Sequence, residues 1–363
     1  MMVRTGIALA AATLFSNVAQ AAPLTATEML KQFNMVVTGN VTSTSHVDGR
    51  SYVGGNVSGG DYVQHINDTP ASAYAGLTVG GNLVNNAHVN GLGAVVGGNA
   101  SGIIVNSGAS YVGGSASSSN FNGDAWINGT AQNVNFNGAG HAASYVNTNN
   151  NRPLNAPTAA MTGALAASTS TDFSSVMTGL SHQLSAMKAT AGASVAFSNG
   201  DRNVTFNGSG VNGVLVFDLT GLDSKIFSSN TSDFYFNLSN ATTVIFNTDD
   251  KTLNLSANFN QAQSLGSKLI WNFAGADTSV TVSRTFGGQA LVADGTFSNV
   301  GGANVEGGVF AKTLNQYGEL HLQSFSGSVP LPVAAVPEAE TYAMLLAGLG
   351  LMGFMARRRK QAA

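Results

Sequence analysis

The chain has 363 residues, and only 9% of them are charged, against roughly 25% in a typical soluble domain. It contains no cysteine, which excludes disulfides, thiolate metal sites, cysteine nucleophiles and iron–sulfur clusters. Between residues 22 and 335 there are 10 Lys or Arg and 16 Asp or Glu, a net charge of −6. Because phosphate contacts supply most of the affinity for nucleic acids, we expect no nucleic-acid partner.

The first 21 residues predict a secretory signal peptide. Arg4 supplies the positive start, residues 7–15 are apolar, and Ala19-Gln20-Ala21 before Ala22 forms an A-x-A cleavage site. The apolar run is too short to span a bilayer permanently. We therefore expect export, cleavage by signal peptidase, and a body that runs from residue 22 to residue 335.

A Val-Gly-Gly-Asn phrase and its variants recur along the first third of the chain. The glycine and asparagine of each copy are Gly39 and Asn40, Gly55 and Asn56, Gly81 and Asn82, and Gly98 and Asn99. The asparagines lie 16, 26 and 17 residues apart, a spacing typical of repeat architectures. A second phrase contains Asn90, Asn106, Asn122 and Asn137. Each unit of about 16 residues is predicted to hold two short strands, with Gly and Asn at the corners because they tolerate positive φ.

These repeats predict an all-β body built as a parallel β-solenoid, in which neighbouring rungs complete one another's core. A β-sandwich is the alternative. Asparagines that recur once per rung predict a ladder of side-chain amides bonded along the axis. The longer interval, with residues 65–75 inside it, predicts a protruding loop. Before the repeats, residues 27–33 are expected to form one or two helical turns.

A helical insertion is predicted at about residues 159–190, after a polar connector at 147–158. Its apolar residues have helical spacing and form one stripe: Phe173, Val176, Met177, Leu180, Leu184 and Met187. Thr171 or Asp172 is expected to cap the start and Gly192 to end it. Packed along the solenoid or over its end, this helix would protect strand edges. Strands then resume at 204–208, 214–219, 234–238, 243–247, 253–255 and 269–273, and no second full helix is expected.

The tail combines three signals. Val336, Pro337, Glu338 and Ala339 precede an apolar stretch at 342–356 and the basic group Arg357, Arg358, Arg359 and Lys360. The stretch is shorter than the ~20 residues of an untilted membrane span, and the basic group should stay cytoplasmic. The motif at 337–339 resembles the PEP-CTERM sorting signal of Gram-negative bacteria, although Ala339 stands where that family has a second proline. The resemblance implies a transient transmembrane helix and cleavage by exosortase near Pro337-Glu338; an ordinary anchor is the alternative.

Several phrases of the body resemble the choice-of-anchor A domain. They lie at residues 33–37, 47–56, 271–276, 286–293, 305–311, 319–321 and 325–327. The resemblance covers most of residues 33–327. It implies a role at the cell surface or in the extracellular matrix, adhesive in some members, with no established catalysis.

The candidate binding residues are few. The six histidines show no zinc-binding spacing, so no zinc site is expected. His46 with Asp48, and Asp61 with His65, are interpreted as solvated pairs in loops, and His321 as a structural hydrogen-bonding residue. Asp249-Asp250 could bind Ca²⁺, but the EF-hand loop and the calcium-binding nine-residue repeat are both absent. We therefore expect no cofactor.

A polysaccharide lyase or hydrolase is the competing interpretation. Such enzymes need carboxylates or bases that converge in a cleft, and Asp48 with Arg50 is the nearest candidate. Four aromatic residues could stack on sugars or simply pack: Tyr52, Tyr62, Tyr111 and Trp126. The sequence favours a non-enzymatic structural or adhesive protein of the cell surface or biofilm matrix, whose partner is an extracellular polysaccharide or another surface ligand.

Overall fold

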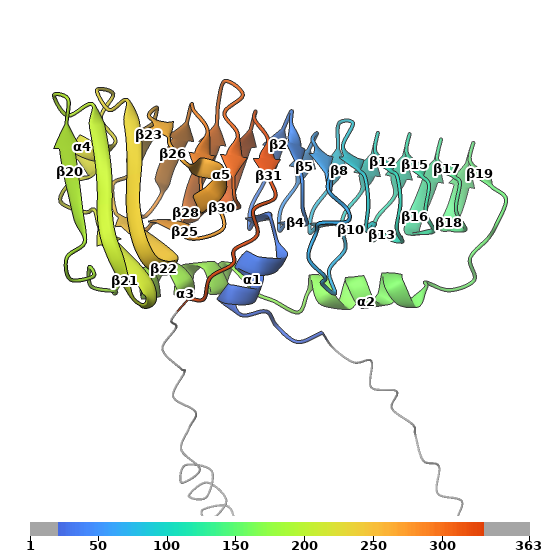
Figure 1. The fold of residues 1–363 in the computed structure, drawn as a ribbon. Coiled ribbons are helices and arrows are strands. Elements are labelled where there is room, and N and C mark those ends of the chain that lie inside the picture. The colour runs from blue at the N-terminus through green and yellow to red at the C-terminus, as the bar shows by residue number, and fades with distance from the viewer. Residues whose placement is uncertain (1–20, 330–363) are drawn as a thin grey trace, which may run out of the picture. The chain divides into compact units, whose positions relative to one another are not determined.

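The computed structural model describes residues 21–329, which form a long parallel β-solenoid with helices along one side (Figure 1). The predicted solenoid is confirmed, and the β-sandwich alternative is wrong. The expected signal peptide and sorting tail lie outside the described residues, apart from Ala21 and Ala22. Within residues 21–329, no helix is long and apolar enough to cross a membrane.

The first arm of the solenoid contains residues 35–150, and its full rungs hold three short strands, one more than predicted. The helix face is formed by β1 Met35–Val37, β4 Ser51–Val53, β7 Leu77–Val79, β10 Ala94–Val96 and β13 Ser110–Val112. The array face is formed by β2 Val41–Ser43, β5 Val57–Ser58, β8 Leu83–Val84, β11 Ala100–Ser101 and β14 Ala116–Ser117. The histidine face is formed by β3 His46–Val47, β6 Asp61–Tyr62, β9 His88–Val89, β12 Ile104–Val105, β15 Asn120–Phe121, β17 Asn135–Phe136 and β19 Asn149–Asn150. Strands β16 Ala125–Gln132 and β18 Gly140–Val146 each run through both the helix face and the array face.

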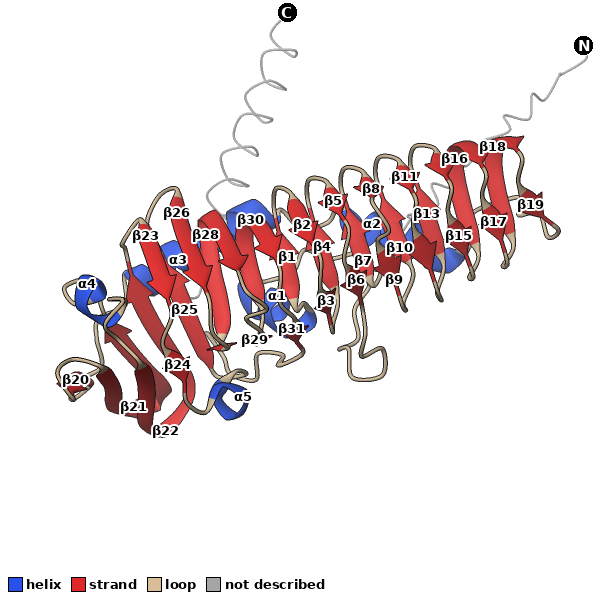
Figure 2. Ribbon diagram, turned by 90° about the horizontal axis from the view of Figure 1, so that it is seen from above, coloured by secondary structure: helices blue, strands red, loops and turns tan. Residues whose placement is uncertain are grey.

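The glycines of the Val-Gly-Gly-Asn phrase are required by close packing between rungs, which corrects the sequence interpretation. None of them has a positive φ. At Gly98, an added Cβ would lie 2.5 Å from Oδ1 of Asn82 and 2.8 Å from the Gly81 carbonyl oxygen of the preceding rung. Positive φ occurs instead at other corners, such as Asn85 and Gly102. The predicted protruding loop is present between β6 and β7 (Figure 2).

The chain returns along the helix face through two helices, where one was predicted: α2 Ala159–Ser168 and α3 Phe173–Ser185. Helix α2 lies over β10 and β13. Asp172 caps α3, because its side chain accepts a hydrogen bond of 3.1 Å from the Ser175 backbone N–H. Helix α3 ends at Ser185 with Ala186 as its C-cap, and not at the predicted Gly192. Four residues of its predicted stripe are buried, Phe173, Met177, Leu180 and Leu184, whereas Val176 and Met187 are half-buried.

The second arm, residues 194–321, coils back toward the first. Its strands are β20 Ser194–Ser198, β21 Asn203–Asp218, β22 Asp233–Thr248, β23 Thr252–Leu255, β24 Asn258–Phe259, β25 Leu269–Phe273, β26 Thr278–Val282, β27 Phe286–Gly287, β28 Gln289–Asn299, β29 Val305–Glu306, β30 Val309–Gln316 and β31 Leu320–His321. Only β20 pairs in the antiparallel sense, and it covers the outer edge of β21. Two short helices, α4 Asp223–Ile226 and α5 Ala262–Leu265, interrupt the strands. The expectation of a single accessory helix is therefore wrong.

The last rung closes on the first. Strand β30 pairs with β1 and β2, and β31 pairs with β3, so the chain begins in the middle of the solenoid (Figure 1). Helix α1, Ala26–Gln32, precedes this rung and starts with a capping box between Thr25 and Glu28. Buried Val, Leu and Ala of the first arm and buried Phe and Trp of the second form one continuous hydrophobic cluster across this seam.

Candidate functional site

The array face presents two rows of uncharged side chains. Its strands alternate buried and outward residues, as expected where one side of a strand faces a core. The first row lies where each rung enters the array face: Asn40, Asn56, Asn82, Asn99, Ser115, Thr130 and Ser144 in the first arm, and Thr313, Thr296, Ser279 and Thr252 in the second. Two positions later come Thr42, Ser58, Val84, Ser101, Ser117, Gln132 and Val146, then Asn315, Ser298, Thr281 and Asn254. Neighbouring rungs of a sheet lie about 4.8 Å apart, so both rows repeat at that spacing.

Hydrogen bonds between rungs hold the first row in place. The side-chain oxygen of Asn40 accepts a bond of 2.8 Å from the backbone N–H of Asn56, and the same bond recurs from Asn56, Asn82 and Asn99 to the next rung. In the second row, Ser117 Oγ donates to Ser101 Oγ at 2.9 Å. In the first arm, the face is therefore pre-ordered by hydrogen bonds among hydroxyl and amide groups.

The predicted ladder of side-chain amides also exists, but in the second phrase. The Nδ2 group of Asn106 donates to Asn90 Oδ1 at 2.9 Å, Asn122 donates to Asn106 at 3.3 Å, and Asn137 donates to Asn122 at 2.7 Å. In the Val-Gly-Gly-Asn copies, the main partner of the side chain is a backbone N–H. Both ladders run along the axis and fix the register of the rungs.

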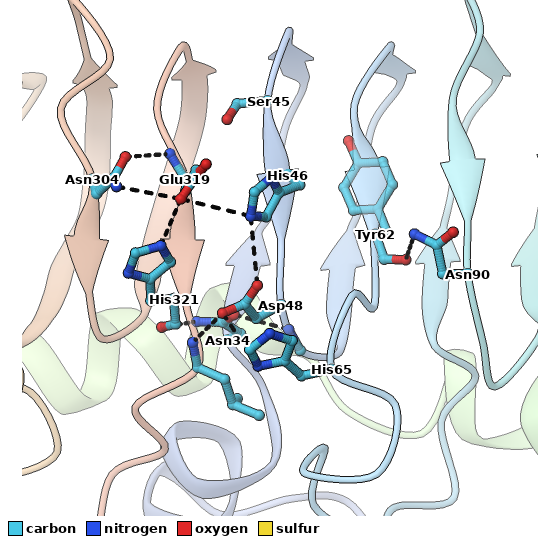
Figure 3. Close-up of polar contacts among 12 residues, drawn as sticks. Asn34, Ser45, His46, Asp48, Tyr62, His65, Asn90, Asn304, Glu319 and His321 are labelled. Atoms are coloured by element: carbon cyan, nitrogen blue, oxygen red, sulfur yellow. Dashed lines mark hydrogen bonds and ion pairs between the residues drawn. The ribbon is translucent and has the colours of Figure 1, made fainter.

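The histidine face gathers four histidines and four carboxylates near the seam. Figure 3 shows five of them: His46, His65, His321, Asp48 and Glu319. His321 lies between two carboxylates, with Nδ1 2.7 Å from Glu306 Oε1 and Nε2 2.7 Å from Glu319 Oε2. On the adjoining first rung, His46 Nε2 lies 3.8 Å from Glu319 and 3.7 Å from Asp48. The cluster thus joins strands from the two ends of the folded chain.

Two other pairs extend the cluster and correct the predicted partners. His65 lies 3.7 Å from Asp48, whereas Asp61 pairs with His88 at 2.8 Å. His46 and His88 lie on strands β3 and β9. Each therefore belongs to a strand that is paired with its neighbours in the sheet, and not to a loop. The expectation of solvated pairs in loops is wrong for them. His321 makes the structural hydrogen bonds expected of it.

Burial and hydrogen bonding oppose each other at His321. Burial lowers the pKa of the imidazole, but the hydrogen bonds to Glu319 and Glu306 outweigh this and leave its pKa above the ordinary value. The same hydrogen bond from His321 lowers the pKa of Glu319. The protonated imidazole is therefore the form that this arrangement favours, and it stabilises the contact between the last rung and its neighbours.

Two groups of side chains have donor atoms close enough to share a metal ion. One donor atom from each of His46, Glu319 and His321 lies within 4.8 Å of the others. In this group the one carboxylate, Glu319, already faces both imidazoles, and both nitrogens of His321 are occupied. The second group is Asp223, Asp249 and Asp250. Sequence spacing revealed neither group, because each brings together residues from separate segments of the chain; only the adjacent Asp249-Asp250 was a signal.

Asp48 and Arg50, the nearest candidates for an enzyme site, do not converge in a cleft. Arg50 is 3% exposed and donates to the backbone oxygens of Tyr74 at 3.1 Å and Pro70 at 2.6 Å. Burial lowers the pKa of Arg50 to about 10. Asp48 points instead into the histidine cluster, and one of its carboxylate oxygens accepts from the Leu322 N–H at 3.1 Å. Arg50 therefore holds the base of the protruding loop.

Most of the aromatic residues that were candidates for stacking on sugars are packed against other side chains of the protein. Tyr62 is fully buried, and Tyr52 lies against Phe173 of α3 with ring centroids 4.3 Å apart. Trp126 stacks on His141 at 3.6 Å, and its Nε1 donates to Asn128. Since a ring face of Trp126 is covered by His141, these residues are better explained by packing than by a sugar-stacking platform.

The fold defines a class: parallel β-solenoid proteins with an ordered, uncharged outward face. Residues 26–113 and 103–322 match the family described as "Putative Ice-binding-like adhesive domain", and the chain belongs to this family. Residues 335–360 match the PEP-CTERM protein-sorting motif. Searches of curated proteins and of solved structures each found no match. The chain is therefore an exported, surface adhesion-type protein whose tail carries a sorting signal that implies membrane transit.

Proposed function

We propose that this protein is a non-catalytic adhesin that exosortase releases from the membrane and that binds neutral polysaccharide at the cell surface or in the biofilm matrix. The observation that carries the proposal is the array face, whose two rows contain no charged residue and consist of hydroxyl and amide side chains except at Val84 and Val146. Regularly spaced hydroxyl and amide groups can bond to a ligand that is itself a repeating array of hydroxyls.

Rigidity supports this function. The side chains of the array are held by bonds between rungs, so binding costs little side-chain entropy. A single contact between neutral groups is weak, about 0.5–1.5 kcal/mol. Many contacts along one extended ligand would add to a useful affinity. The phrases that resemble choice-of-anchor A domains fit the same role at the surface.

The binding experiment places charge on the face. Cells that export the full chain would be tested for retention on films of cellulose, a neutral polymer, and alginate, an acidic one. We expect preferential retention on cellulose, and at least a tenfold loss with Ser101→Lys/Ser117→Lys. The matched control, Asn120→Lys/Asn135→Lys, adds the same charges to adjacent rungs of the histidine face and should bind normally. Equal loss in both variants, or no retention of the wild-type cells, would contradict the proposal.

The sorting step has its own test. Replacement of Pro337-Glu338 by Ala-Ala should leave the full-length chain in the membrane fraction, while the wild type is shortened and released in cells that contain exosortase. If both chains stay membrane-bound at full length, the tail acts as an ordinary anchor.

The alternative, a carbohydrate-active enzyme, predicts turnover of a polysaccharide by the wild type that is abolished by Asp48→Ala. The buried, separately bonded positions of Asp48 and Arg50 argue against it.

A further inference from the structure

Three carboxylates meet at one corner of the second arm. Asp223 begins α4, and Asp249 and Asp250 directly follow β22. One oxygen atom from each lies within 4.8 Å of the other two. This corner connects the helix face, through β22, to the array face, which resumes at β23.

Two side chains of this corner are buried without hydrogen bonds of good geometry. Asp223 is 2% exposed, and its carboxylate oxygens form no such bond, although the Thr248 hydroxyl and the Asp249 backbone N–H lie close to them. Thr248 is 1% exposed, and its hydroxyl, which faces the Asp223 carboxylate, likewise forms no hydrogen bond of good geometry. A buried polar group without a partner is costly, and a buried charge is more so. Asp223 and Thr248 therefore keep oxygen atoms that a bound cation could ligate.

The charge at this corner is not compensated by protein. Within residues 21–329, none of the three carboxylates forms an ion pair with Lys, Arg or His. The histidine cluster differs, because every carboxylate there faces an imidazole. Burial raises the pKa of Asp223 to about 6, and repulsion from Asp250 and Asp249 acts in the same direction. A bound cation would remove both the repulsion and the unpartnered oxygens.

The donor set selects the kind of cation. All the available atoms are carboxylate or hydroxyl oxygens, the ligands preferred by Ca²⁺ and Mg²⁺, and no nitrogen or sulfur donor belongs to this group. Ca²⁺ tolerates irregular sites, whereas Mg²⁺ demands near-octahedral geometry. Asp249 and Thr248 also line an open hollow of about 650 Å³, together with His182 of α3.

We propose that Asp223, Asp249 and Asp250, with the Thr248 hydroxyl, bind one Ca²⁺ ion that fastens α4 to the turn between β22 and β23. The ion would hold this corner of the second arm in the geometry from which the array face begins. The proposal is independent of the ligand of that face.

The test uses the full chain, purified in detergent and stripped with EGTA. Calorimetric titration with CaCl₂ should show one ion per chain, and 2 mM CaCl₂ should raise the unfolding midpoint by several degrees. Asp223→Asn and Asp250→Asn should each weaken Ca²⁺ binding at least tenfold. The control, Asp68→Asn, removes an exposed carboxylate from the protruding loop and should bind as the wild type does.

A second readout separates metal binding from a folding defect. In EGTA, Asp223→Asn should unfold at the same or a higher temperature than the wild type, because it removes a buried charge; in CaCl₂ the order should reverse. No binding by the wild type, equal binding by the Asp223 and Asp250 variants, or binding of MgCl₂ in preference to CaCl₂ would overturn the proposal.

Discussion

At the scale of single residues, the seam depends on ionised side chains with opposite pH responses. Because the pKa of His321 is raised, its contribution to stability is complete below the ordinary histidine value of 6.5 and is lost as pH rises through the raised pKa. The pKa of Glu319 is lowered, so its contribution is present above 4.5 and is lost as pH falls through the lowered value. The seam is therefore most stable between these two pH values.

His321→Ala should lower the free energy of unfolding by about 1–3 kcal/mol, because it leaves the buried Glu306 carboxylate without its hydrogen-bond partner. Urea unfolding measured at about pH 5.5 and about pH 9 should show a larger difference from the wild type at the lower pH. His182→Ala, on the exposed side of α3, is the control and should have little effect at either pH. A difference that does not change with pH would contradict this account.

At the scale of elements, close packing between neighbouring rungs limits which residue can occupy a rung corner. Gly98→Ala should destabilise the protein by about 1–3 kcal/mol, because the new methyl group would collide with Asn82 and Gly81 of the preceding rung. Gly179→Ala is the matched control, since its Cβ would meet nothing within 4 Å. In the interior of α3 it should stabilise by about 0.5–1 kcal/mol. Urea unfolding midpoints that move in the same direction for both variants would refute the packing explanation.

Periodicity explains which elements could be predicted. Rungs of similar length give a regular spacing of repeated residues in the sequence, so the solenoid and its protruding loop were predictable. Most long strands of the second arm were also predicted, from their runs of apolar and β-branched residues. The third strand of each rung was missed because it has only two residues, such as His46–Val47. The start of α3 was predicted, because Asp172 was one of the two expected caps, but α2 was not predicted as a separate helix because residues 159–168 are rich in alanine and form no apolar stripe.

The candidate site was far less predictable than the fold. Asn34 and Gly307, which bond to each other at the seam, are 273 residues apart. No local pattern in the sequence indicates that the last rung lies against the first. For the same reason, the sequence did not indicate that His46 and His321 share a cluster. It also did not indicate that Asp223 faces Asp249-Asp250.

At the scale of the whole molecule, the seam couples two arms that would otherwise behave separately. In a solenoid, stability is roughly a sum over rungs and their interfaces. The 2%-exposed Asn34 spans this interface: its Nδ2 group donates to Gly307 O at 2.5 Å and to His321 O at 3.2 Å, and its Oδ1 accepts from Gly49 N at 3.0 Å. Loss of these bonds should weaken the coupling between the arms more than it weakens either arm.

Asn34→Ala should therefore split unfolding into two transitions. With Trp126 replaced by phenylalanine, Trp271 is the remaining tryptophan and its fluorescence reports the second arm, while circular dichroism reports both arms. In the background protein the two signals should coincide, as for one cooperative unit; after Asn34→Ala they should separate. Asn106→Ala removes a ladder bond inside the first arm and should leave them coincident. Coincident signals in the Asn34 variant would mean that the continuous hydrophobic cluster alone is sufficient to couple the arms.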